Sequence, residues 1–117
     1  MIPVGWPSAL PAPEDEEFPE QAVRWMLDLG PAEWRTQRVW HDYPQALAHR
    51  LRCDLEARRE GARTAYGTTR AALASTSTDV ERVLTAVEAE GATLALRLRE
   101  VELVQEALAG RRWRDRL

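Results

Sequence analysis

Several reactive side chains in this sequence have spacings that could support chemistry, and the tightest pair is a histidine and a cysteine. His49 and Cys53 are four residues apart, so on a helix both could face one metal ion. No third or fourth ligand follows, because His41 lies in a different turn and the chain has no Cys-x-x-Cys or Glu-x-x-His. We therefore interpret Cys53 as a small packing residue and His49 as a surface residue, and predict no metal and no cofactor.

Carboxylate pairs and serines offer equally little for catalysis. Glu56 with Glu60, and Glu102 with Glu106, are spaced one helical turn apart among many arginines, which is typical of a solvated helix face. Acid–base catalysis needs a cleft that perturbs such groups, and nucleophilic catalysis needs a serine in a glycine elbow. Residues 61–67 begin and end with glycine but lack the lysine of a phosphate-binding loop. We predict that the protein is not an enzyme.

The clearest structural pattern in the sequence is a heptad repeat of apolar residues between residues 78 and 109. Its seam positions alternate in steps of four and three, which predicts a long helix packed lengthwise on a partner. They are Val80, Leu84, Val87, Gly91, Leu94, Leu98, Val101, Gln105 and Leu108. Thr78 and Glu81 suit an N-terminal capping box, and Gly110 suits a left-handed C-cap. At 1.5 Å per residue the helix is roughly 46 Å long, so its partner must be equally long.

The partner is the segment from residue 42 to residue 74. Its apolar or small residues share one face, and they are Leu47, Leu51, Leu55, Ala62, Tyr66, Thr69 and Leu73. Asp42 to Gln45 reads as its N-cap box, with Pro44 in the first turn. The short polar link Ser75-Thr76-Ser77 makes the two helices antiparallel neighbours. The predicted fold class is all-α, with a long antiparallel, coiled-coil-like hairpin over residues 42–110.

Folding at residue 77 pairs positions whose numbers sum to about 153. Gly61 and Ala62 then lie opposite Gly91 and Ala92. A glycine inside a helix costs about 1 kcal/mol relative to alanine, so we predict that these residues allow close backbone approach at a waist. On this interpretation Gly91→Leu would splay the hairpin.

Opposite charges flank the two apolar faces. The first helix carries a stripe of Arg52, Arg59, Arg63 and Arg70, and the second carries Glu81, Glu88, Glu102 and Glu106. Such stripes set register and orientation more than they add stability. The simpler interpretation of the arginine stripe is a solvent-exposed flank of the helix pair, and the alternative is a surface that binds nucleic acid.

The N-terminal third predicts an arm followed by a small helical cap. Residues 1–13 hold four of the seven prolines around Trp6, which favours an extended, polyproline-like arm that is either disordered or anchored by Trp6 on another surface. Residues 14–41 predict a short helix from Pro19 to Gly30 and a further turn, both rich in tryptophan. Leu96 and Leu103 lie opposite the main seam, so we expect the N-terminal helix to cover them, with a second copy as the alternative, and we expect a dimer through the remaining long face.

The tail, residues 111–117, combines four arginines with a tryptophan. These residues suit phosphate contacts and base stacking, or an acidic protein patch such as residues 14–17. The tail's candidate contact residues are Arg111, Arg112, Trp113, Arg114 and Arg116.

Composition bounds the cellular setting. The 117 residues suit one domain, and no apolar run approaches the 18 residues of a membrane span. The N-terminus lacks the basic start of a secretory signal, and a single cysteine fits a reducing cytoplasm. All sixteen basic residues are arginine, which is typical of GC-rich bacterial coding, and the net charge of −3 disfavours polyanion binding as the main role.

We therefore predict a cytoplasmic, non-catalytic assembly or adaptor subunit that acts through helical protein–protein contacts. It is expected to self-associate and to form part of a larger, phage-like or secretion particle. Its predicted partner-binding residues are Trp6, Leu96, Leu103, Arg111, Arg112, Trp113 and Arg114. The alternative is a nucleic-acid-associated regulator that uses Arg52, Arg59, Arg63, Arg70 and the tail with Arg116.

Overall fold

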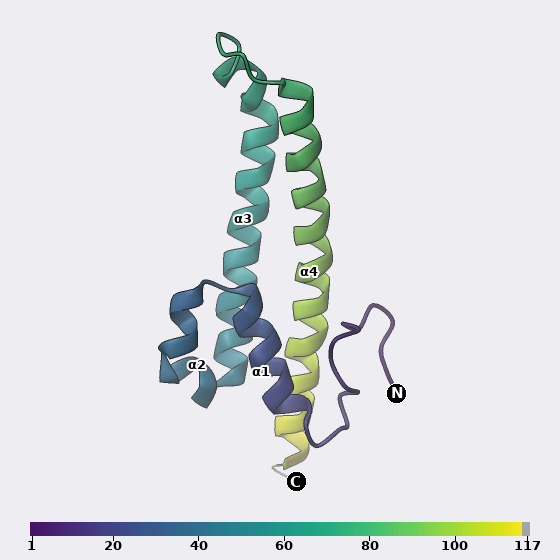
Figure 1. Ribbon diagram of the computed structural model, residues 1–117. Coiled ribbons are helices and arrows are strands. Elements are labelled where there is room, and N and C mark those ends of the chain that lie inside the picture. The colour runs from purple at the N-terminus through teal and green to yellow at the C-terminus, as the bar shows by residue number, and fades with distance from the viewer. Residues whose placement is uncertain (116–117) are drawn as a thin grey trace. The chain divides into compact units, whose positions relative to one another are not determined.

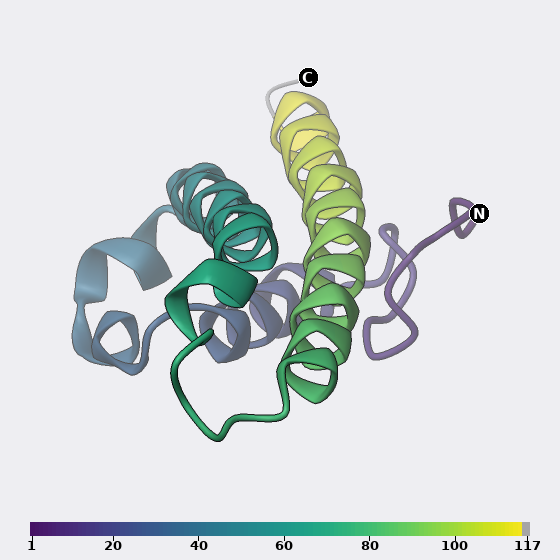
Figure 2. The same cartoon turned by 90° about the horizontal axis from the view of Figure 1, so that it is seen from above.

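The computed structural model describes residues 1–115, with side chains described through residue 110, and its regular elements within these ranges are all helices. The elements in order are α1 (Phe18–Leu29), a 3-10 helix η1 (Ala32–Thr36), α2 (Arg38–Asp42), α3 (Pro44–Ala72) and α4 (Val80–Asp115). Helices α3 and α4 are in extensive contact as an antiparallel hairpin, which Figures 1 and 2 show. The predicted all-α hairpin with short N-terminal helices is confirmed.

The chain divides into two compact units, which we describe separately. The terminal unit contains residues 1–54 and 99–117, and therefore the arm, the short helices, the start of α3 and the end of α4. The hairpin unit contains residues 55–98, which are the rest of α3, the turn and the rest of α4.

The core of the terminal unit is built from three helices. Helix α1 begins with Pro19 in its first turn and buries one face at helical spacing. The residues of that face are Phe18, Ala22, Val23, Met26 and Leu27. The start of α3 contributes Leu47 and Leu51 to the core, and the end of α4 contributes Val101 and Val104, all four fully buried.

The predicted end of the first short helix at Gly30 is confirmed. Gly30 has extended backbone angles, and its N–H donates to the carbonyl of Met26 at 3.2 Å. A Cβ atom at Gly30 would lie 2.5 Å from the ring of buried Trp34, so only glycine allows this close approach. Trp34 also packs near Trp40, with ring centroids 5.7 Å apart, and beneath the Arg50 guanidinium, 5.0 Å from the ring centroid.

The N-terminal arm is a series of tight turns, so the prediction of an extended, polyproline-like path is wrong. The backbone N–H of Trp6 donates to the Pro3 carbonyl at 3.1 Å, and Gly5 takes a φ of +84° inside that turn. The physical reason is that a left-handed glycine at the third turn position reverses the chain, which the proline content alone does not reveal. The Trp6 ring then packs on Phe18 at 5.4 Å, and Leu10 is buried in the same unit.

The core of the hairpin unit follows the predicted heptad seam. Its buried members are Leu55, Ala62 and Thr69 from α3, and Leu84, Leu94 and Leu98 from α4. The seam positions Val80, Val87 and Gly91 are only half-buried. On α3, Tyr66 is 50% exposed and Leu73 is half-buried. The seam prediction is therefore confirmed at six of its eleven positions in this unit, and the exceptions lie on both helices.

Three predicted helix ends need correction. Helix α4 is capped by Asp79 in place of Thr78, because the Asp79 carboxylate accepts the backbone N–H of Arg82 at 3.2 Å. The Thr78 hydroxyl instead accepts a hydrogen bond from Thr76. Helix α4 also continues through Gly110, since glycine permits a left-handed end without requiring one and no proline follows.

Helix α3 begins at Pro44 without the predicted Asp42 cap. The Asp42 carboxylate lies 3.8 Å from Arg38 one turn earlier, so α2 takes up the residue that the sequence pattern assigned to the cap of the long helix. Over the described part of the chain, no helix has both the length and the apolar character needed to cross a bilayer.

Candidate functional site

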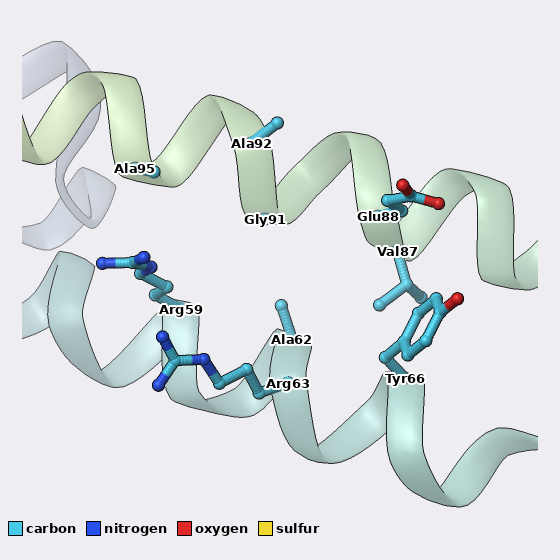
Figure 3. Close-up of a pocket in the computed structure, with 9 residues that line it drawn as sticks. All are labelled: Arg59, Ala62, Arg63, Tyr66, Val87, Glu88, Gly91, Ala92 and Ala95. Atoms are coloured by element: carbon cyan, nitrogen blue, oxygen red, sulfur yellow. The ribbon is translucent and has the colours of Figure 1, made fainter.

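An open hollow of about 540 Å³ lies between α3 and α4 within the hairpin unit (Figure 3). We call it the furrow. Its lining residues are Arg59, Ala62, Arg63, Tyr66, Val87, Glu88, Gly91, Ala92 and Ala95. Ala62 with Gly91, and Tyr66 with Val87, have numbers that sum to 153, so the predicted register agrees with this lining.

The predicted waist at the glycines is wrong, because this is where the hairpin opens. A Cβ atom added at Gly61 or Gly91 would meet nothing within 4 Å. In the same register, Leu55 lies level with Leu98, and these larger buried residues hold the helices apart. Small side chains placed between such spacers do not reach each other, so they leave a hollow.

Gly91→Ala is expected to stabilise the hairpin unit. The added methyl group enters open space, and the substitution removes the cost of glycine in a helix, so the free energy of unfolding should rise by about 0.5–1 kcal/mol. Thermal and urea denaturation followed by circular dichroism at 222 nm measures this. Gly61→Ala, also in open space, is the matched control with the same expected gain. A loss of stability in Gly91→Ala but not in Gly61→Ala would show that the α3 and α4 backbones do approach closely at Gly91.

Opposite charges pair across the hairpin, as the stripes predict, at two of the positions. In the hairpin unit Arg70 and Glu81 lie 2.6 Å apart, and in the terminal unit Arg52 and Glu102 lie 3.9 Å apart. The hydrogen bond and negative charge of Glu81 raise the pKa of Arg70. A group whose pKa is raised by folding contributes stability at pH values below that pKa. This contribution is lost only as the pH rises through the raised pKa. This pair is therefore insensitive to deprotonation of Arg70 near neutral pH.

Three charged side chains line the furrow without pairing across it. Arg63 lies 3.5 Å from Glu60 on its own helix, while Arg59 and Glu88 form no ion pair within the described residues. Figure 3 shows the Arg59 and Arg63 guanidiniums extending from α3, the Val87 side chain next to the Tyr66 ring, and the Glu88 carboxylate on α4. All three are exposed, so the furrow presents two cations along one wall and one anion on the other.

The remaining predicted partner-binding residues lie in varied settings. Trp6 is half-buried, and its indole N–H donates to the Pro11 carbonyl at 3.1 Å. Leu103 is half-buried near the arm, with its Cδ1 3.7 Å from where a Cβ of Gly5 would be. Leu96, in the hairpin unit, is 51% exposed, and its predicted cover by the N-terminal helix stays a prediction. Its half-turn offset from the seam points it away from the other helix.

The candidate residues of the tail lie outside the described side chains. The predicted contacts of Arg111, Arg112, Trp113 and Arg114 therefore stay predictions, and Arg116 lies outside the described residues altogether.

The pairs considered for chemistry are exposed. His49 Nε2 lies 3.9 Å from Cys53 Sγ, and among the described residues no group of three or more His, Cys, Asp or Glu is placed to hold a metal ion. Glu102 and Glu106 line a second hollow of about 410 Å³ in the terminal unit, together with Arg52, Gln105 and Ala109. That carboxylate pair therefore lies beside a guanidinium in an open setting.

Sequence reasoning found the residues that meet at the furrow but not the furrow itself. The available signal was the run of small residues between larger spacers, which predicts a hollow as readily as a close approach.

Comparison of the chain with protein-family models, curated proteins and solved structures finds no match.

Proposed function

We propose that this protein is a non-catalytic assembly subunit that self-associates through the furrow of its hairpin unit. The observation that carries the proposal is the furrow itself, a solvent-open hollow lined by small residues between two long helices. Helical proteins that bind other helices use grooves of this kind, in which small residues let another backbone approach closely.

The composition of the furrow supports contact with protein. Its floor combines Ala62, Gly91, Ala92 and Ala95 with the half-exposed ring of Tyr66, and charged groups form its rim. An apolar floor with a polar rim is the usual anatomy of a protein–protein interface. The proposed role in a larger particle rests on self-association of this kind, repeated or combined with a further partner.

Filling the furrow should weaken the association. In Gly91→Leu the new side chain enters open space inside the furrow, so the hairpin should fold while its docking surface is blocked. Gly61→Leu is the matched control, because Gly61 has equally open surroundings but does not line the furrow.

Sedimentation equilibrium over a wide range of protein concentration measures the association constant of each chain. We expect the parent and Gly61→Leu to associate alike, and Gly91→Leu to associate at least about tenfold more weakly. Equal association of Gly91→Leu and the parent, with circular dichroism showing equal helix content, would overturn the proposal.

The nucleic-acid alternative is favoured by the adjacent guanidiniums of Arg59 and Arg63, and it predicts a different response to salt. A protein that neutralises several phosphates loses affinity steeply as salt rises, whereas association through packed side chains changes little. Anisotropy of a fluorescent 20-base-pair duplex separates the two. Duplex binding that falls steeply with salt and disappears in the Arg59→Ala, Arg63→Ala double variant would favour the alternative.

A further inference from the structure

We propose that the furrow is occupied by the furrow of a second copy of this chain, in a two-fold dimer whose hairpin units run parallel. In this arrangement α3 of one copy faces α4 of the other. The inference rests on the proposed function and specifies its geometry. It follows from the placement of the three furrow charges that do not pair across the hairpin.

The charges are self-complementary under this symmetry. In the observed register Arg63 lies level with residue 90, so Glu88 is offset from it by two residues, or about 3 Å along the helix. A two-fold axis parallel to the helices exchanges α3 and α4 while keeping every residue at its height. Each Arg63 then faces Glu88 of the second copy, and symmetry forms the contact twice.

The other face-to-face arrangement places like charges together. A two-fold axis perpendicular to the helices in the plane of the interface would lay α3 on α3. Arg59 and Arg63 of one copy would then approach their own counterparts, and the furrow lining on α3 includes no acidic residue. Like-charge contacts of this kind are costly, so the charge pattern selects the parallel arrangement.

The packing agrees with the same arrangement. Ala62, Gly91, Ala92 and Ala95 allow two hairpins to approach closely, and the 50% exposed ring of Tyr66 would be covered. Because α3 and α4 are antiparallel within one chain, parallel copies place every α3 beside an antiparallel α4. The result is a four-helix bundle whose neighbouring helices are all antiparallel, the common form of such bundles.

The area of the surface sets the expected strength. The eighteen residues of α3 in the hairpin unit, 55–72, span roughly 27 Å, and two helices side by side are about 20 Å wide, which gives a footprint of roughly 500 Å² per copy. Stable interfaces bury about 800 Å² per partner, so the hairpin units alone should form a reversible dimer that dissociates on dilution.

Charge reversal tests the geometry. Arg63→Glu places two glutamates at each contact, and Glu88→Arg places two arginines there, so each variant should dimerise at least about tenfold more weakly than the parent. Mixing the two variants in equal amounts restores both contacts, so the mixed dimer should form with parent-like affinity. Arg82→Glu and Glu90→Arg are exposed controls outside the furrow lining and should leave the association within about threefold of the parent.

Disulfide trapping tests the orientation. In a Cys53→Ser background, which removes the exposed native thiol, a mixture of Arg63→Cys and Glu88→Cys chains should form a crosslinked heterodimer under mild oxidation. Arg63→Cys alone should crosslink far less, because the parallel dimer separates its two copies of α3.

The outcomes separate the inference from the function on which it rests. If Gly91→Leu blocks association but the mixed charge variants associate no better than each alone, the parallel dimer is overturned and association through the furrow stands. Efficient crosslinking of Arg63→Cys with itself would likewise overturn the parallel arrangement. If Gly91→Leu associates like the parent, the proposed function itself is overturned.

Discussion

Replacing Phe18 with alanine should lower the free energy of unfolding by about 3–5 kcal/mol, the largest loss we expect from a single substitution. The Phe18 ring is fully buried at the start of α1 and is the surface on which the Trp6 ring packs, at 5.4 Å. Removing it leaves a cavity in the core and takes away the support of the N-terminal arm. We therefore expect two effects, a lower stability and a more exposed Trp6.

Urea denaturation followed by tryptophan fluorescence measures both effects of Phe18→Ala. A red shift of the emission before the main transition would report the release of Trp6. Tyr43→Ala, at a side chain that is 63% exposed in the same unit, is the control and should change stability by no more than about 0.5 kcal/mol. A loss below about 1 kcal/mol for Phe18→Ala would show that the arm and α1 contribute little to the fold.

Replacing Leu51 with alanine should cost about 2–5 kcal/mol. Leu51 is fully buried on α3, and the register places it beside Val101 and Glu102 of α4. The lost methyl groups leave a cavity because α1, α3 and α4 all contribute to this core and cannot all collapse onto it.

The control for Leu51→Ala is Leu96→Ala, the same chemical change at a side chain that is 51% exposed. Its expected effect is within about 0.5 kcal/mol. Urea unfolding followed by circular dichroism measures both variants. Equal losses of unfolding free energy at the two positions would mean that the seam is not the main source of stability. They would also mean that another copy buries Leu96 in solution.

The hairpin could be predicted because its signals are local and repeat many times. The steps of four and three from Val80 to Leu108, and a three-residue polar link, leave few other ways to bury so many leucines. The helix ends were less predictable, because Thr78 and Asp79 are both good caps and the choice between them depends on neighbouring hydrogen bonds. Thr76 bonds to Thr78, and this leaves Asp79 to accept the Arg82 N–H.

The arm and the furrow were mispredicted for a different reason, since both depend on contacts between distant residues. The turn at Gly5 is stabilised where Trp6 meets Phe18, which lies twelve residues away along the chain. The opening at Gly91 depends on the helix spacing set by larger buried residues such as Leu55 and Leu98, about two turns away. A helical pattern shows which residues face each other, but not how far apart their backbones lie.

The aromatic residues are unevenly divided between the units, and this has a spectroscopic consequence. Residues 55–98 contain no tryptophan or phenylalanine, and Tyr66 is their single tyrosine. Because Tyr43 is the other tyrosine of the chain, biosynthetic incorporation of fluorotyrosine yields just two ¹⁹F resonances. One of them reports directly on the furrow, so its occupancy can be followed by magnetic resonance in the otherwise unaltered protein.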